Sequence, residues 1–200
     1  MDMEEQDAGA KKMDKREQVT GQIIYEPYMP SALTMRVFLK ITEIGDNIKV
    51  NLEELIKTKT AAKCIGEGYV KPGSVRILKY SAGKINGDLI EYHVQFECMI
   101  CHPVEGMKVE CVSKYITKAG IHAEVIDRAG NVPMVVYIAR DHHMQNAAFE
   151  KIEENTKLIV TVVGVRYELN DPQIEVIGYL VEVSQTQDKV QKKPPITILE

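Results

Sequence analysis

Cysteine and histidine side chains at metal-ligand spacing are the first groups in this sequence that could do chemistry. Cys98 and Cys101 are separated by two residues and followed by His102, which is the spacing of c-type haem attachment and of one half of many zinc sites. If residues 92–101 form a strand, the two thiols point to opposite faces, because side chains alternate along a strand. A structural zinc also needs four ligands, and the other two cysteines lack a partner at this spacing. We therefore expect structural cysteines, with no metal, haem or other cofactor.

The segment Arg140-Asp141-His142-His143 is the densest cluster of polar side chains. Paired histidines beside an aspartate could bind a metal or act as a general base. No HExxH pattern or regularly spaced third ligand accompanies them, so a surface role, contact with RNA, and metal or catalytic chemistry all stay open. The sequence has no phosphate-binding loop, no GxSxG and no dinucleotide fingerprint. Because Gly66-Glu67-Gly68 is also too short to hold a phosphate and is expected to shape a turn, we expect no catalytic site of its own.

The composition is that of a folded protein from a reducing compartment. The 200 residues are 44% hydrophobic and carry 29 Asp+Glu against 25 Lys+Arg. No apolar run predicts a membrane span, residues 1–19 lack the apolar stretch of a secretory signal, and four cysteines are too few for a disulfide scaffold. The acid excess is concentrated in residues 104–183, which have twelve Asp+Glu and eight Lys+Arg. This balance argues against a basic coat that binds nucleic acid in general.

Residues 20–103 are expected to form an α+β domain, an RNP-like antiparallel sheet with a helix. Asn51 is expected to cap a helix that runs to about Ala62, with two acidic residues in its first turn. Asn86–Gly87 predicts a tight hairpin turn before the clearest strand of the chain. The expected strands, chosen for their alternating apolar residues, are Met35–Ile44, Val75–Tyr80 and Leu89–Ile100.

Residues 104–183 are expected to form a five-stranded, all-β barrel of the OB type. Turn residues separate five β-rich runs, and a short helical stretch, Met144–Glu154, lies between the third and the fourth. This order is typical of an OB barrel. The runs are Val109–Ile116, Gly120–Ile126, Pro133–Ile138, Leu158–Tyr167 and Gln173–Val183.

Both ends are expected to be tails. Residues 1–19 carry six acids and four bases with few apolar residues, so we expect them to be disordered. In residues 184–200, Pro194–Pro195 block a helix, and the final ITILE is either a loose end or an edge strand that docks on a partner.

The two expected domains together resemble a known family. The segments PVEGMKVECVSKYITKAGIHAEV, MVVYIARDHH and LIVTVVGVRYELNDPQIEVIGYL resemble, in order and spacing, the RNA-binding OB module of the S-one type. Residues 20–183 as a whole resemble the larger stalk subunit of archaeal and eukaryotic RNA polymerases, the family that includes the seventh subunit of polymerase II and its archaeal counterpart. The residues that carry this are CIGEGYV (64–70), YHVQFECMICHP (92–103) joined directly to Glu105–Gly106, VGVRYELND (163–171) and IGYL (177–180).

The resemblance implies a non-catalytic stalk subunit of a DNA-directed RNA polymerase. In that family the first domain docks on the large core subunits, the smaller stalk subunit packs alongside, and the OB domain guides nascent RNA during transcription. Such a protein would be intracellular, in the nucleus if it is cellular, or in the virion or a cytoplasmic viral factory if it is virus-encoded. The divergent barrel and the added tails favour a viral version. The docking tip would be Gly83, Lys84, Ile85, Asn86 and Gly87, which without the resemblance would be a plain hairpin turn.

RNA contact by this type of barrel uses exposed aromatic rings for stacking and basic side chains for phosphates. The S-one pattern commonly has aromatic residues before the glycine and two positions after it, where this chain has Ala119 and His122. With the acid excess of the same domain, this predicts weak contact with nascent single-stranded RNA, guided by an assembly. The candidate residues are Lys114, Tyr115, Lys118, His122, Tyr137, Arg140 and His142.

Two other functions remain open from the sequence. A free-standing RNA-binding or translation-associated OB protein would need a barrel that binds RNA tightly alone. A small redox or metal enzyme would need reactive cysteines or a bound metal. The junction at residues 102–106 is short, so we expect the two domains to be held rigidly.

Overall fold

One long strand, β6 (Leu89–Cys101), organises the N-terminal half of the molecule. The computed structural model describes residues 26–45, 47–144 and 146–184. Along β6 the residues Tyr92, Val94, Phe96, Cys98 and Ile100 are buried and the residues between them are more exposed, so one face of the strand lies in a core. This confirms the strand expected from the alternating pattern.

The other strands of this antiparallel sheet all pair with β6 directly or through a neighbour. β1 (Met29–Lys40) follows one edge of β6 over twelve residue pairs without a register shift. Because β1 covers that edge, the strands β5 (Lys84–Asn86), β4 (Arg76–Tyr80) and β3 (Gly68–Val70) follow one another along the opposite edge. A short strand, β2 (Cys64–Ile65), pairs with β3 and completes the sheet.

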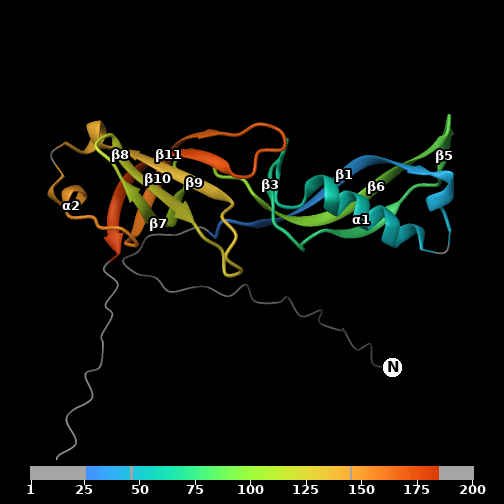
Figure 1. The fold of residues 1–200 in the computed structure, drawn as a ribbon, viewed down its shortest axis with the longest axis horizontal. Helices are drawn as coiled ribbons and strands as arrows, with labels where there is room; N and C mark the ends of the chain where they lie inside the picture. The colour runs from blue at the N-terminus through green and yellow to red at the C-terminus, as the bar shows by residue number, and fades with distance from the viewer. Residues whose placement is uncertain (1–25, 46, 145, 185–200) are drawn as a thin grey trace, which may run out of the picture.

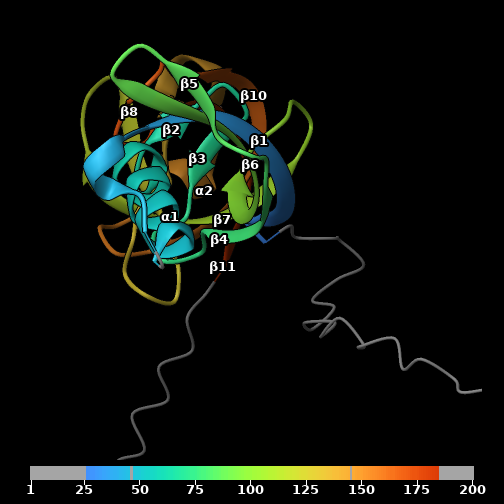
Figure 2. The ribbon, with the colours of Figure 1, turned by 90° about the vertical axis from the view of Figure 1, so that its right-hand side faces the viewer.

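A single long helix, α1 (Ile48–Thr60), covers one face of this sheet (Figure 2). Its buried residues Leu52, Ile56 and Thr60 recur every four positions, so they form one stripe along the helix. The stripe packs on β1 and β4 and shares a core with Phe96. The sheet and its helix thus have their own apolar core.

The C-terminal half is a closed barrel of five strands in the order β10-β11-β9-β8-β7. All its pairs are antiparallel except β9–β11, which is parallel, and this mixed closure is consistent with an OB-like barrel. A 3-10 turn, η2 (Arg140–His143), and a short helix, α2 (Ala147–Glu150), connect β9 to β10. The strands are β7 (Lys108–Ile116), β8 (Gly120–Val125), β9 (Met134–Ala139), β10 (Lys157–Arg166) and β11 (Ile174–Ser184).

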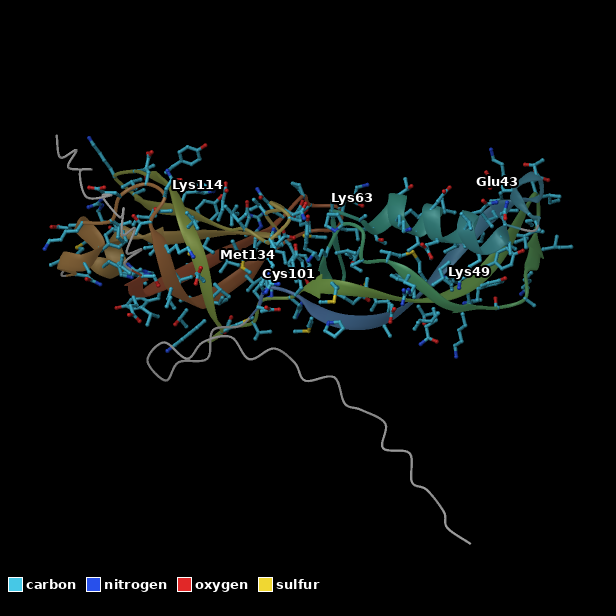
Figure 3. The ribbon with its side chains drawn as sticks, turned by 90° about the horizontal axis from the view of Figure 1, so that it is seen from below. Glu43, Lys49, Lys63, Cys101, Lys114 and Met134 are labelled. Atoms are coloured by element: carbon cyan, nitrogen blue, oxygen red, sulfur yellow. The ribbon has the colours of Figure 1, made fainter. Side chains whose placement is uncertain are left out.

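The sheet and the barrel follow one another along the long axis of an elongated molecule (Figure 1). The turn between β10 and β11 reaches β2, where the Cys64 amide donates to the Asp171 carbonyl at 2.8 Å and the Asn170 amide donates to the Cys64 carbonyl at 2.8 Å. On β6, Cys101 lies at the boundary between the two halves and belongs to the core of the barrel (Figure 3). These contacts, together with the short junction, favour the expected rigid arrangement.

A second set of contacts joins the residues before β1 to the β8–β9 loop. The Tyr28 hydroxyl donates to Asp127 Oδ2 at 3.2 Å, and Arg128 lies 3.8 Å from Glu26. Lys71 Nζ lies 4.8 Å from the centre of the Tyr28 ring. We call Tyr28, Asp127 and the residues bonded to them the junction latch.

Several boundaries differ from the expected ones. The first strand begins at Met29 and ends at Lys40, where a 3-10 turn, η1 (Ile41–Glu43), follows, so the expected strand Met35–Ile44 is wrong at both ends. The helix begins at Ile48, not after Asn51, since the Asn51 amide already donates to the Asn47 carbonyl at 3.1 Å. The Asn51 side-chain amide donates to the Glu43 carbonyl at 2.7 Å. No acidic residue lies in its first turn.

The expected barrel strands are confirmed, each within one residue of its observed ends. The expected helical stretch Met144–Glu154 is reduced to the four residues of α2. The antiparallel sheet with its helix is present, while its RNP-like character stays a prediction. The ITILE segment lies outside the described residues, and among the described residues no helix is long and apolar enough to cross a membrane.

Candidate nucleic-acid interface

Three aromatic side chains lie side by side on the outside of the barrel, one on each of β7, β8 and β9. Tyr115 pairs with His122, and His122 pairs with Tyr137. The ring centroids are 5.7 Å apart for Tyr115 and His122 and 5.1 Å apart for His122 and Tyr137. Tyr115 is 64% exposed and Tyr137 is 44% exposed, so both rings are open to a stacking partner. We call these three residues the aromatic row.

Two basic residues expected to contact RNA lie together at another part of the same barrel surface. Lys118 and Arg140 line a shallow pocket of about 490 Å³ with Ile116 and Thr117. The Arg140 guanidinium donates to the Thr117 carbonyl at 3.4 Å, and its backbone amide donates to the Ala119 carbonyl at 2.9 Å. Positively charged groups can contact the phosphates of a strand whose bases stack on aromatic rings elsewhere on the surface.

The β7–β8 loop, which lines this pocket, is closed by two hydrogen bonds between Thr117 and Gly120. Thr117 Oγ1 donates to the Gly120 carbonyl at 3.0 Å and accepts from the Gly120 amide at 3.2 Å, which closes the loop. Gly120 passes so close to the Ile138 carbonyl that a Cβ there would clash with backbone. The missing side chain of Gly120 therefore lets the start of β8 lie close to the end of β9, directly before Arg140.

Two buried polar atoms in this region have no hydrogen-bond partner among the described residues. They are Nδ1 of His122 and Nε of Arg140. Buried polar atoms are nearly always satisfied in folded proteins, by protein, water or a ligand. One of these nitrogen atoms belongs to the aromatic row and the other to the basic pocket, and both are free to form a further hydrogen bond with water or a ligand.

The remaining two residues expected to contact RNA, Lys114 and His142, belong neither to the aromatic row nor to the basic pocket. Lys114 Nζ lies 4.0 Å from Glu124 Oε2, so its charge is partly offset by a carboxylate on β8. His142 is exposed, but it lines a different pocket of about 640 Å³ with Asp141, Asn146 and Tyr179. RNA contact by all seven residues stays a prediction; the structure brings together Tyr115, His122 and Tyr137 in the row, and Lys118 and Arg140 in the pocket.

The last residue of the Arg140–His143 cluster is buried and is not among the residues expected to contact RNA. His143 is 3% exposed, with both ring nitrogens hydrogen-bonded and its ring stacked on Phe149. It follows Arg140 by three residues on a 3-10 turn, where side chains three apart lie one above the other. The densest polar cluster of the sequence is thus divided between an exposed histidine and a buried one.

The expected docking tip lies at the opposite end of the molecule from the barrel (Figure 1). The residues Lys84, Ile85 and Asn86 form β5, and Ile85 is 76% exposed. The turn lies at Gly87–Asp88, one residue later than expected, since Asn86 pairs with Leu89. Gly83 packs so tightly that a Cβ would lie 2.6 Å from an Ile90 methyl group.

Further exposed apolar side chains lie at the same end of the molecule as the tip, outside the five residues predicted from the sequence. Phe38 on β1 is 38% exposed, Leu89 on β6 is 37% exposed and Ile41 in η1 is 62% exposed. Exposed apolar residues that gather on one end of a small protein commonly mark a protein interface. Whether this end docks on a polymerase stays a prediction.

The cysteines behave as structural residues. Cys98 packs in the core of the sheet and Cys101 in the core of the barrel, which confirms that the two thiols point to opposite faces. Burial raises the pKa of both thiols, to about 11 for Cys98 and about 12 for Cys101. Thiolates are therefore scarce at neutral pH, and no group of three or more potential metal ligands gathers among the described residues.

Fold and site together define an elongated protein in which an antiparallel sheet with an apolar tip is joined to an OB-like barrel with exposed aromatic rings. No family model matches the chain. The chain is similar to a protein of Acanthamoeba polyphaga mimivirus named "Putative DNA-directed RNA polymerase subunit L376". The two are 24% identical over 181 residues, a match that covers 82% of this chain and 86% of the mimivirus protein. A match of that extent includes parts of both the sheet and the barrel.

Proposed function

We propose that this chain is a non-catalytic subunit of a DNA-directed RNA polymerase and, within that class, its larger stalk subunit. The observation that carries the proposal is the similarity to the mimivirus protein, which extends over most of both chains. The order of the two halves, sheet first and barrel second, supports the stalk assignment because the stalk family has the same order. Activity on nucleotides then belongs to the large subunits.

Docking on the polymerase is assigned to the tip of the sheet. Ile85 is 76% exposed, and Phe38, Ile41 and Leu89 are further exposed apolar side chains at this end, so docking would remove apolar surface from water. The large core subunits are the expected partners at this end, and a smaller stalk subunit is expected alongside the sheet. If the chain is virus-encoded, we expect it in virions or in cytoplasmic viral factories.

Guiding of nascent RNA is assigned to the aromatic row and the basic pocket. The rings of Tyr115 and Tyr137 supply stacking surface, while Lys118 and Arg140 supply positive charge. The barrel region as a whole carries four more acids than bases, which weakens attraction to phosphate. We therefore expect RNA binding that is weak in the isolated chain and strengthened when the polymerase delivers the strand.

Co-purification tests the polymerase assignment. A tagged chain expressed in its source cells or virus is expected to recover the large polymerase subunits, identified by mass spectrometry. Ile85→Asp is expected to reduce that recovery at least about tenfold, as loss of an apolar anchor does at interfaces. Leu169→Asp is the matched control, since Leu169 is 70% exposed in the β10–β11 turn, away from the tip, and should leave recovery unchanged. Recovery without polymerase subunits would reject the assignment.

Binding of a fluorescent oligo(U) strand tests the RNA role. Tyr137→Ala and Tyr115→Ala are each expected to weaken binding by about 5- to 100-fold, because one stacked base is worth roughly 1–3 kcal/mol. Tyr80→Ala is the control, since Tyr80 is 41% exposed on the sheet, away from the barrel. Equal affinities for all four proteins would reject the aromatic row as the RNA site. Tight binding by the isolated chain with a steep salt dependence, and no polymerase partner, would favour the free-standing RNA-binding protein.

A further inference from the structure

The pocket that contains His142 has an exposed aromatic ring in its wall. It has a volume of about 640 Å³ and lies between η2, the start of α2 and the outer face of β11. The ring is that of Tyr179 on β11, which is 47% exposed. A pocket of this size can take a small organic ligand, and an exposed aromatic ring offers a base a face on which to stack.

The Tyr179 ring rests on a rigid, buried neighbour. The ring of His143 lies against it with centroids 4.5 Å apart. Nδ1 of His143 lies 2.8 Å from the Ala139 carbonyl oxygen, and Nε2 accepts from the Leu180 amide at 3.0 Å, so the imidazole is fixed on both sides. Because Tyr179 packs on a fixed group, it is already ordered before a ligand arrives, and this lowers the entropy cost of stacking.

The same stack of rings connects this pocket to the basic pocket. Phe149 stacks on His143 with centroids 4.9 Å apart and planes 10° from parallel, and the Arg140 guanidinium lies 5.5 Å from the centre of the Phe149 ring. These spacings limit the distance between Arg140 and the Tyr179 ring to about 15 Å. An OB fold typically binds about four or more nucleotides, so one strand can reach both pockets.

The polar side chains of the pocket suit the edge of a base better than a phosphate. Asp141 is exposed in the pocket, and its carboxylate repels phosphate and can only accept hydrogen bonds. Oδ1 of Asn146 accepts from the Ala148 amide at 3.0 Å, so its NH₂ group is the part left for a ligand. The pocket therefore offers two acceptor oxygens and one donor.

Guanine is the RNA base whose Watson–Crick edge complements this set. Its N1–H and N2–H groups are adjacent donors that one carboxylate can accept together, and its O6 beside them accepts from an NH₂ group. Uracil has a single donor between two acceptors. In adenine and cytosine, a ring nitrogen with a lone pair lies next to the amino group and would face the carboxylate. Single-stranded RNA is commonly recognised in this way, by stacking and by hydrogen bonds to base edges.

We propose that this pocket binds a guanine base of single-stranded RNA, which stacks on Tyr179 and bonds Asp141 and Asn146 through its Watson–Crick edge. Arg140 contacts a phosphate of the same strand from the basic pocket. The proposal rests on the proposed RNA role of the barrel and adds a base preference to it. The aromatic row alone would not give this preference, because every base has a face that can stack.

The first measurement is an NMR titration of the ¹⁵N-labelled full chain with guanosine monophosphate. The backbone amides of Tyr179 and Leu180 and the Asn146 side-chain NH₂ are expected to shift and to saturate together, while the Tyr80 amide on the sheet stays unchanged. Uridine monophosphate is expected to bind about three- to tenfold more weakly, the effect of losing a hydrogen bond. Inorganic phosphate is expected to leave these signals in place. Equal affinity for the two nucleotides, the same shifts with phosphate alone, or no shifts at these residues would overturn the proposal.

The second measurement compares two fluorescent strands of about eight nucleotides, oligo(U) and the same strand with one central guanine. The wild-type chain is expected to bind the guanine strand about three- to tenfold more tightly. Tyr179→Leu, which keeps an apolar side chain against His143, and Asp141→Ala are each expected to abolish this difference. Tyr80→Ala, on the sheet, should keep it. A difference that persists in Tyr179→Leu or in Asp141→Ala would overturn the proposal.

The outcomes separate this proposal from the RNA role of the barrel. If Tyr115→Ala and Tyr137→Ala weaken binding of both strands but the wild-type chain does not prefer the guanine strand, the RNA role stands and the guanine pocket is rejected. If neither strand binds, the RNA role fails, and the titration with guanosine monophosphate still decides whether the pocket takes a guanine base.

Discussion

Replacing Tyr28 with phenylalanine removes one hydrogen bond of the junction latch and leaves the ring in place. The Tyr28 hydroxyl donates to Asp127 Oδ2 at 3.2 Å between the sheet and the barrel. A hydrogen bond to a charged acceptor contributes roughly 1.5–3 kcal/mol, and this one is long and only partly buried, so we expect a loss of about 1 kcal/mol. For a protein of this size, that loss lowers Tm by about 2–4 °C.

A double-mutant cycle isolates the contact from the rest of the loop. Asp127 also accepts from the Ala129 and Asn131 amides at 2.8 Å each, so Asp127→Asn alone is expected to cost more than Tyr28→Phe. The coupling energy from urea unfolding of the two single variants and the double variant is expected to be about 1 kcal/mol. Tyr80→Phe, on an exposed tyrosine of β4, is the control and should be neutral. A coupling energy below about 0.3 kcal/mol would refute the latch.

The same contact has a defined dependence on pH. Burial acts to raise the pKa of Asp127, but the hydrogen bonds from Asn131, Ala129 and Tyr28 outweigh it and hold that pKa below its usual value. A carboxyl whose folded-state pKa is lowered stabilises the fold fully above its unfolded pKa of about 3.9, and this contribution is lost as the pH falls through the folded value. Burial and the Asp127 charge raise the pKa of Tyr28, so its hydroxyl remains a donor at neutral pH. The destabilisation by Tyr28→Phe should thus be full at neutral pH and shrink below about pH 4.

Three further predictions concern the two cores and the turns between them. Gly68→Ala is expected to lower the free energy of unfolding in urea by at least about 2 kcal/mol, since Gly68 has φ +130° and an added Cβ would clash with the Cys101 carbonyl. Gly66→Ala is the control and should cost under about 1 kcal/mol, because there is open space around Gly66. Ser113→Ala is expected to cost about 1–3 kcal/mol by the same assay, because the fully buried Ser113 hydroxyl donates to one carbonyl at 2.6 Å and accepts from an amide at 2.9 Å; a neutral result would contradict this. All four thiols, with pKa values raised by burial to about 11–12, should resist iodoacetamide near pH 8 in the native protein and react in denaturant, as measured by mass spectrometry.

Strand positions were predictable wherever one face of the strand is buried. In β6 apolar residues alternate with polar ones, and the five barrel strands are β-rich runs bounded by turn residues. Both signals are visible without any knowledge of partners. β1 was placed too late because its first half, from Met29, has exposed or half-buried side chains and is held by pairing with β6. Two- and three-residue strands such as β2 and β3 have no period to detect. They exist because the β10–β11 turn and β6 bond to them.

The candidate site was predictable in residue type and only partly in geometry. Exposed tyrosines on alternating strands indicated the aromatic row, because the barrel order places β7, β8 and β9 next to one another. His142 and His143 are neighbours in sequence, yet one is exposed and the other is buried. That difference depends on the 3-10 turn and on the Leu180 amide 37 residues later. No local pattern could supply it.

Strand β6 also limits how the length of this chain can change over evolution. One of its faces lies in the core of the sheet through Phe96 and Cys98, and its last residue, Cys101, lies in the core of the barrel. Inserting or deleting a single residue near the middle of the strand would turn every later side chain to the other face. Both cores would lose the residues that lie beyond the change, and the pairing with β1 would slip by one residue from that point to the end of the strand. We therefore expect that natural relatives gain and lose residues in the loops, such as the one after Asp127, while the stretch from Leu89 to Cys101 keeps a constant length.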